Sequence, residues 1–221
     1  MANLSRQRRD EEKEQRREAI IDAAEVVFAA HGFEHCKMED VARQARVSRA
    51  LVYLYFGNKS ELQLAVCVRA LLSFRERHAT AAAAADRGYD KIIAIGRAYM
   101  RFANEQPLYF AALSRFEAHR PETLALGSSE RAVLDVGYNI HELTVGALQH
   151  GMRDGSIRQL DDPLLVAITL WSYTHGAIQV AQTKGPFLEE AGIATGALLD
   201  HAIELAMRGL APDTDQSDRP T

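Results

Sequence analysis

Apolar residues recur along this chain at the spacing of an α-helix and not at the alternation of a β-strand. Between residues 14 and 31 they fall at offsets of 0, 3, 4, 7 and 8, which places them on one helical face. Residues 38–45 repeat the first four of these offsets, beginning at Met38. Because no segment shows sustained alternation of apolar and polar residues, the sequence predicts an all-α protein.

The breaks between these periodic segments contain residues that usually end or begin helices. Gly32 is a suitable helix stop, and Ser48 is a suitable N-cap because its hydroxyl can accept a hydrogen bond from a free amide. Three of the six prolines stand at further joints: Pro107, Pro121 and Pro163. We predict about nine helices, at residues 14–31, 38–45, 49–56, 60–85, 88–105, 107–119, 128–153, 162–183 and 188–209.

The same pattern divides the chain into two domains with polar ends. Residues 1–13 are predicted to be a flexible arm, and residues 211–221, which are polar and contain two prolines, to be disordered. Residues 14–74 and residues 75–210 form the two predicted domains. A chain of 221 residues has the length expected of one large or two modest domains.

Three short helices followed by a long one form the pattern of a helix-turn-helix domain. In that geometry the second helix of a closely spaced pair lies in the DNA major groove. The predicted helix at residues 49–56 is short and must be held by packing, and Val52 and Phe56, four residues apart, can face inward together. The residues then left on its outer face are Ser48, Arg49, Ala50 and Tyr53, with the side of Leu54 left open.

The outward residues have chemistry that suits DNA, although a solvated helix surface is the alternative. Arg49 can bind a guanine edge through two hydrogen bonds or pair with a phosphate. Tyr53 can stack on a sugar or donate to a phosphate. Positive and hydroxyl groups nearby suit the phosphate backbone, which adds Lys37, Tyr55 and Lys59 to the predicted DNA-binding residues. For the basic residues of the arm, a solvated tail and insertion into the minor groove both remain open; these are Arg6, Arg8 and Arg9.

The segment GFEHCKMEDVARQARVSRALVYLYFGNKSEL, from Gly32 to Leu62, resembles the N-terminal DNA-binding segment of TetR-family transcriptional regulators. The likeness extends over about residues 14–74. It rests on residues of the same type at the same spacing, at Gly32, Phe33, Asp40, Val41, Ala42, Ala45, Val47, Ser48, Val52, Tyr53, Tyr55, Phe56, Lys59 and Leu62.

Four positions depart from the family pattern. Cys36 and Lys37 stand where the family usually has threonine or serine to cap the second helix, so Cys36 with Glu39 would form a weakened capping box. Ala50 replaces a frequent glycine. Arg46 replaces the usual turn glycine, where a positive φ would be strained for arginine.

Beyond residue 75 the resemblance implies an all-helical regulatory domain that binds a small molecule and dimerises through its last two helices. The stretches Ala98–Leu113 and Leu170–Ala181 resemble one branch of these domains, in which a tryptophan precedes His-Gly by a few residues. Aromatic side chains on these helices are predicted to line an apolar cavity, with simple core packing as the alternative. The predicted ligand-binding residues are Tyr99, Phe102, Phe110, Phe116, Trp171 and His175.

The composition of the chain narrows the classes of function that remain. A net charge of −4 argues against bulk coating of nucleic acid but leaves room for a local basic patch. Two cysteines, Cys36 and Cys67, are too few for a disulfide framework and indicate a reducing compartment. No metal, cofactor or catalytic motif stands out, so we expect no enzyme activity. The apolar stretch Pro163–Ala181 contains polar residues and is predicted to be a buried helix, not a membrane span.

Together these patterns predict a cytoplasmic, ligand-responsive transcriptional regulator. The resemblance implies a homodimer on a roughly palindromic DNA operator, with repression as the default and a small, partly apolar molecule that releases the DNA. Residues 162–183 and 188–209 of each chain would form a four-helix dimer interface. Two alternatives remain: a helical small-molecule sensor that acts through protein contacts without binding DNA, and a helical enzyme.

Overall fold

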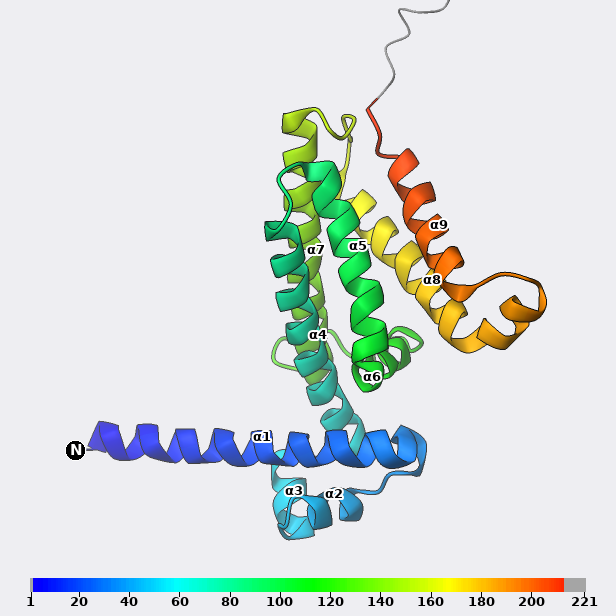
Figure 1. Cartoon of the computed structure of the whole chain (residues 1–221). Coiled ribbons are helices and arrows are strands. Elements are labelled where there is room, and N and C mark those ends of the chain that lie inside the picture. Colours follow the sequence, from blue (N-terminus) through cyan, green and yellow to red (C-terminus); the bar gives the residue numbers. More distant parts are fainter. Residues whose placement is uncertain (1, 213–221) are drawn as a thin grey trace, which may run out of the picture. The chain divides into compact units, whose positions relative to one another are not determined.

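The computed structural model describes residues 2–212, with side chains from residue 6 onward. Within that range the chain forms nine helices and no strand (Figure 1), so the all-α prediction is confirmed. Residues 213–221 of the predicted tail lie outside the described part. The helices are α1 (Ala2–His35), α2 (Met38–Gln44), α3 (Arg49–Tyr55), α4 (Lys59–Ala83), α5 (Gly88–Glu105), α6 (Pro107–Glu117), α7 (Ser129–Asp154), α8 (Pro163–Glu190) and α9 (Thr195–Arg208).

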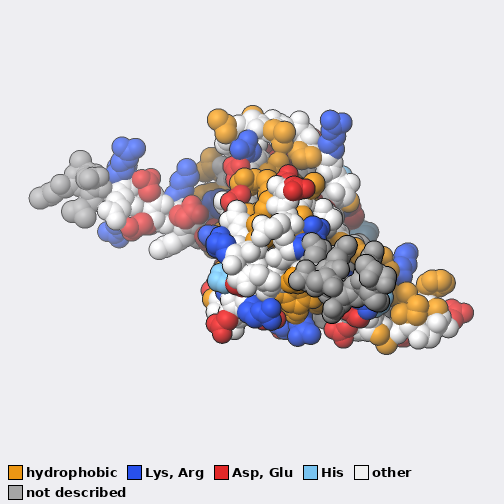
Figure 2. All heavy atoms as spheres, turned by 90° about the horizontal axis from the view of Figure 1, so that it is seen from above, with side chains coloured by type: hydrophobic (Ala, Val, Ile, Leu, Met, Phe, Trp, Pro, Cys, Tyr) orange, Lys and Arg blue, Asp and Glu red, His pale blue; other side chains and the backbone are white. Residues whose placement is uncertain are grey.

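Helix α1 includes most of the segment predicted to be a flexible arm, because it begins at Ala2. Charged side chains one turn apart stabilise this part of the helix, as in the pair between Arg8 and Glu12 at 3.3 Å. Figure 2 shows Lys or Arg and Asp or Glu side chains interspersed along it. The predicted stop at Gly32 is confirmed by its φ of 72°, which interrupts the helix before a final turn.

Helix α8 is longer than predicted. The break predicted at residues 184–186 is wrong, because the helix continues through Pro186. The actual stop is Gly192, which has a φ of 75°. Beside it the amide of Ile193 donates to the carbonyl of Leu188 at 2.8 Å, which satisfies a carbonyl at the end of the helix.

Much of the apolar surface of α8 is uncovered in the single chain. Only 17% of its most apolar 18-residue stretch is buried, so the prediction of a buried helix over Pro163–Ala181 is wrong for the isolated chain. By length and composition alone α8 could cross a membrane, a test that interior helices of soluble proteins also pass. The residues that α8 does bury are Ala167, Ile178, Ala181 and Gly185.

The chain forms two compact units, and each draws on two separate stretches of sequence. The first consists of the residues up to Leu71 together with Leu108–Leu134. The second consists of Leu72–Pro107 together with the residues from Asp135 on. The first division lies close to the boundary predicted after residue 74, but the sequence pattern did not predict that α6 joins the first unit.

Helix α6 joins the first unit through its apolar face. Leu108, Tyr109 and Ala112 pack against the core of that unit. The thiol of Cys67 on α4 also lies 3.3 Å from the carbonyl oxygen of Ala112. Burial raises the pKa of this thiol to about 12, which makes it an inert interior group. The most deeply buried residues of this core include Ile20, Ile21, Ala24, Val41, Val52, Leu62 and Val66.

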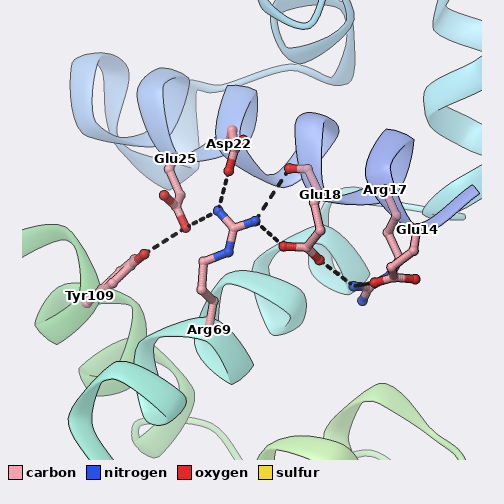
Figure 3. A network of polar contacts seen from close by, with 7 residues as sticks. All are labelled: Glu14, Arg17, Glu18, Asp22, Glu25, Arg69 and Tyr109. Atoms are coloured by element: carbon pink, nitrogen blue, oxygen red, sulfur yellow. Dashed lines mark hydrogen bonds and ion pairs between the residues drawn. The ribbon is translucent and has the colours of Figure 1, made fainter. Parts of the chain in front are cut away.

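Arg69 on α4 joins three carboxylates of α1 (Figure 3). Its guanidinium donates to Glu18 at 2.5 Å, to Asp22 at 2.6 Å and to Glu25 at 2.9 Å. The hydroxyl of Tyr109 on α6 donates to the same Glu25 carboxylate at 3.0 Å. Burial, and then the negative charge of Glu25, raise the pKa of Tyr109 to about 12. One side chain therefore links α1 and α4 directly and α6 through Glu25.

In the second unit the start of α5 crosses α7 at very short range. A Cβ atom on Gly88 would lie 2.1 Å from the backbone nitrogen of Gly151, so only glycine fits there. The carboxylate of Asp154 accepts the Gly88 amide hydrogen at 2.8 Å and caps α5. The core around this crossing contains Ile92, Ile95, Ala147, Leu148, Ile157, Leu160, Ala167, Met207 and Leu210.

Replacing Gly88 with alanine is expected to lower the free energy of unfolding by roughly 3 kcal/mol or more, because backbone atoms of α7 cannot yield to the new methyl group. Urea unfolding followed by circular dichroism measures this change. The matched control is Gly137→Ala on α7, where nothing lies within 4 Å of the added Cβ. That variant should gain up to about 1 kcal/mol from helix propensity. Equal stability of the two variants would contradict the close crossing.

Candidate functional site

Helix α3 packs one apolar face against the core and leaves its other face, which includes Leu54 with 77% of its surface exposed, in solvent. Ser48 caps it, and its hydroxyl oxygen accepts the Leu51 amide hydrogen at 3.2 Å. Val52 and Phe56 are buried, with 0% and 3% of their surface exposed. Tyr53 is 39% exposed. The short helix is thus held by its inward face while its outward face is available to a partner.

Arg49 is exposed on this face, but its charge has partners within the protein. Its guanidinium pairs with Glu39 of α2 at 2.6 Å. It also donates to the Tyr53 hydroxyl at 3.5 Å and lies 5.2 Å from the centre of that ring. Tyr53 and then Glu39 raise the pKa of Arg49. These contacts orient the arginine, and a DNA base or phosphate would have to replace Glu39.

Two residues predicted to touch DNA are used inside the fold. The ammonium of Lys59 donates to the carbonyls of Phe33, Glu34 and Cys36 at 2.9, 3.1 and 3.1 Å. An ammonium has three donors, so these carbonyls, at the end of α1, take all of them. Tyr55 is half-buried and packs against the core. The prediction that Lys59 faces phosphate therefore does not fit its geometry, and the half-buried Tyr55 is partly used in core packing.

The turn between α2 and α3 brings further basic residues to the surface. Arg46 has a φ of 56°, which confirms the predicted strain at this position. Lys37 is exposed at the start of α2, where the carboxylate of Asp40, and not that of Glu39, accepts its amide hydrogen. Arg43 and Arg46 are exposed as well and were missed in the sequence prediction. Their position on the polar side of α2 and its turn was the available signal. Ala50 is exposed on α3.

The second unit contains an apolar cavity of about 50 Å³ that is partly open to the surface. Five helices line it: α4, α5, α7, α8 and α9. Its wall contains no Lys, Arg, Asp or Glu among the described residues. The wall residues are Phe74, His78, Ile92, Ile95, Gly96, Tyr99, Ile140, His141, Thr144, Ala167, Leu170, Trp171, Thr174, Ile203, Ala206 and Met207.

Tyr99, Trp171 and His175 come together at this cavity, although they lie far apart in the sequence. Tyr99 and Trp171 line the cavity, and the Tyr99 hydroxyl lies 2.6 Å from Nδ1 of His175. The Trp171 ring stands between His175 and His141, with ring centres 5.9 and 5.5 Å away. Burial lowers the pKa of both histidines. The aromatic wall thus carries neutral polar groups near neutral pH.

The other three predicted ligand residues lie elsewhere. Phe102 is completely buried, and its ring centre lies 5.0 Å from that of Phe74, behind the wall. Phe110 and Phe116 belong to α6 and therefore to the first unit. Phe110 is buried in that unit, and Phe116 lines a separate polar depression beside the start of α4. The helical spacing of aromatic residues could not distinguish these three from cavity residues.

His78 is a cavity residue that sequence reasoning missed. It follows Arg-Glu-Arg in the chain, a setting typical of an exposed residue, yet only 3% of its surface is exposed. Its Nδ1 lies 2.9 Å from the carbonyl oxygen of Phe74, and the two rings are 3.8 Å apart. Burial lowers the pKa of His78 to about 4.

Family models match most of the chain. The model described as bacterial regulatory proteins, tetR family, matches residues 20–66. The model described as tetracyclin repressor-like, C-terminal domain, matches residues 92–206. Among curated relatives, the HTH-type transcriptional regulator BetI of Agrobacterium fabrum is 45% identical over 67 residues, which are 30% of this chain and 32% of BetI. The chain thus spans about a third of the length of that relative.

Solved structures share the fold over nearly the whole chain. A protein of unknown function from Rhodococcus sp. RHA1 has a TM-score of 0.72 and 22% identity, covering 89% of this chain and 95% of its own. The transcriptional regulator FadR from Bacillus subtilis, solved in complex with stearoyl-CoA, has a TM-score of 0.67 and 18% identity, covering 87% and 98%. BetI and FadR are both transcriptional regulators.

The buried histidine predicts loss of stability in mild acid. His78 has a pKa of about 4 in the folded chain and about 6.5 when unfolded. Between these two pH values the imidazole is protonated in the unfolded chain and neutral in the folded chain. The free energy of unfolding should therefore fall by about 2 kcal/mol between pH 7 and pH 5 through His78 alone. The pKa values of His141 and His175 are lowered too, which adds in the same direction.

Urea unfolding at several pH values tests this expectation. His78→Leu should make the free energy of unfolding depend less on pH between pH 7 and pH 5. His31→Gln, at an exposed position, should leave this pH dependence unchanged. If His78→Leu kept the full slope, the buried neutral state of this imidazole would be wrong.

Proposed function

Because the chain belongs to the TetR family of bacterial regulatory proteins, we propose that it is a DNA-binding transcriptional regulator controlled by a small molecule in the cavity of the second unit. The observation that carries this proposal is α3 itself. Its apolar side is anchored by Val52 and Phe56, while Ser48, Arg49 and Tyr53 stay on the outside of the unit. Residues on that face would read DNA in the cytoplasm.

Helix α3 would enter the major groove by its capped end. Ser48 and Ala50 are small enough to let the backbone approach the bases. Arg49, already oriented by Tyr53, would exchange Glu39 for a guanine edge or a phosphate. Lys37, Arg43 and Arg46 surround this face and would contact phosphates. Lys59 is left out of the interface, because its ammonium holds the end of α1.

A homodimer would present two copies of α3 to one face of a duplex. Successive major grooves on one face lie about 34–36 Å apart, so a roughly palindromic operator is expected. Repression follows in the simplest case, since a dimer on an operator blocks access to the promoter.

The exposed face of α8 supports dimerisation through the last two helices. Leu165, Ile168 and Val180 share one side of the helix with Gly176, and they are 61%, 38% and 43% exposed. Phe187, on the same side, is 68% exposed. Figure 2 shows hydrophobic side chains on the surface near the connection between α8 and α9, at the right of the view. A second copy of this face would cover apolar surface that water otherwise meets.

The cavity supports an effector with an apolar body. FadR of Bacillus subtilis was solved with stearoyl-CoA, which shows that this fold accommodates an apolar chain in that relative. The cavity here is about 50 Å³, so any effector larger than a few atoms must move its helices apart. Such movement changes DNA affinity only if the effector binds the two arrangements unequally.

Arg49→Ala and Tyr53→Ala are each expected to weaken binding to the operator by about 10- to 100-fold, because each removes a contact to a base or to the backbone. The operator would first be selected from genomic fragments with the purified protein, and fluorescence anisotropy would then give the affinity. Arg101→Ala, which removes an exposed arginine on α5, is the matched control and should bind normally.

Helicity and mass show whether a loss of DNA affinity comes from the lost contact or from misfolding of the variant. Both variants should keep the wild-type helicity and mass, because the two side chains are exposed. Unchanged affinity of both variants, or binding that does not weaken as salt rises, would contradict α3 as the DNA-reading element. It would favour a sensor that acts through protein contacts.

The dimer face predicts that Leu165→Glu combined with Val180→Glu weakens self-association at least about 100-fold, since unpaired carboxylates would be buried in an apolar interface. Light scattering coupled to gel filtration would report a shift from dimer to monomer. The control Leu126→Glu replaces a leucine that is 87% exposed in the first unit and should remain dimeric. A dimer that survives both glutamates must use another surface.

A further inference from the structure

His78 brings a buried imidazole ring to the cavity wall. The residue is 97% buried, as its exposed fraction of 3% requires, and it is part of the cavity wall. Its Nδ1 lies 2.9 Å from the carbonyl oxygen of Phe74. A carbonyl oxygen can only accept, so Nδ1 must carry the proton of the ring. In the neutral ring Nε2 then has a lone pair and no hydrogen.

Nε2 has no hydrogen-bond partner within the part of the chain that the structure describes. A ligand group that donates a hydrogen bond would satisfy this acceptor. The pKa of His78, lowered by burial to about 4, keeps the ring neutral near pH 7. The acceptor is therefore present under the conditions in which the protein would act.

The rest of the wall restricts what else can bind. The Tyr99 hydroxyl is engaged with His175. The other titratable groups at the wall are Tyr99 and His141, and the described lining residues include no carboxylate to balance a cation. The remaining lining residues are apolar or glycine, apart from Thr144 and Thr174. The wall thus suits an uncharged, largely apolar body.

We propose that the cavity selects an apolar compound with a single hydroxyl group, which donates its hydrogen bond to Nε2 of His78. An alcohol, a phenol and an undissociated carboxylic acid share this chemistry. The proposal rests on the proposed function, since it names the class of effector that would occupy the same cavity. Ethers and esters of the same size lack the donor, and ammonium compounds lack a counter-charge in the wall.

Trp171 makes the binding directly observable, because it lines the cavity and is the only tryptophan of the chain. Its fluorescence would be titrated in the full-length protein with 1-hexanol, with methyl pentyl ether and with hexylamine, which have equal numbers of heavy atoms. Hexanol should bind about 3- to 10-fold more tightly than the ether, as one net hydrogen bond predicts. Hexylamine, charged at neutral pH, should give no saturable change.

A titration with hexanoic acid tests whether the bound hydroxyl group belongs to an undissociated carboxylic acid or to an alcohol. If the undissociated acid is the bound form, its apparent affinity should rise steeply from about pH 8 to about pH 5, whereas that of hexanol should stay nearly constant. Should both ligands gain affinity equally on acidification, a change in the protein and not the hydroxyl would control binding, and the proposal would fail.

Two variants test the role of His78 itself. His78→Leu should reduce the preference for hexanol over the ether to about onefold while leaving the ether affinity unchanged. His31→Leu, which makes the same change at an exposed histidine of the first unit, is the matched control and should keep the preference. A preference retained by His78→Leu would overturn the assignment.

The wild-type protein alone can also refute the proposal. Equal affinities for hexanol and the ether, or no saturable response of Trp171 to hexanol, would do so even if His78→Leu failed to fold. These titrations contain no DNA, so their failure leaves the operator-binding measurements, and with them the regulator assignment, untouched.

Discussion

In the first unit a single guanidinium pairs with three carboxylates on one side of α1. Glu18, Asp22 and Glu25 recur at one-turn intervals on that helix, and like charges so placed repel one another. Arg69 brings a positive charge from α4 to all three, with only 23% of its side chain exposed. Because Glu25 also accepts the Tyr109 hydroxyl, the same contact fixes α6. The frame on which α3 rests is thus held by long-range charge pairing added to apolar packing.

That frame explains how a two-turn helix can be stable while one of its faces stays in solvent. A segment as short as α3 is unstable alone in water, and its stability here comes from Val52 and Phe56 within the core. Lys59 supports the same region by saturating three carbonyls at the end of α1. The lysine that sequence similarity would place on phosphate therefore acts one step earlier, in positioning the loop that precedes α2.

Features set by neighbouring residues were predictable from sequence, and features set by distant ones were not. Periodicity located α2, α3 and α5 nearly to the residue, and the glycine-like φ of Arg46 followed from its place in the turn. The helical arm was missed although its charge pairs one turn apart are a local pattern. The transfer of α6 to the first unit depends instead on contacts between residues far apart in sequence, which no local pattern records. The buried state of His78 is of the same kind, since its neighbours in sequence are charged while its neighbours in space are aromatic.

The two faces of α8 give the second unit a physical route from ligand to assembly. Ala167, Leu170, Trp171 and Thr174 point toward the cavity, whereas Leu165, Ile168 and Val180 lie on the exposed side. A helix is stiff, so a displacement on one face is carried to the other. The cavity is too small for an effector of ordinary size, which means that occupation must shift a lining helix. If α8 is the helix that moves, the same shift alters the face proposed for dimerisation. The spacing of two DNA-reading helices would then respond to a ligand that touches neither of them.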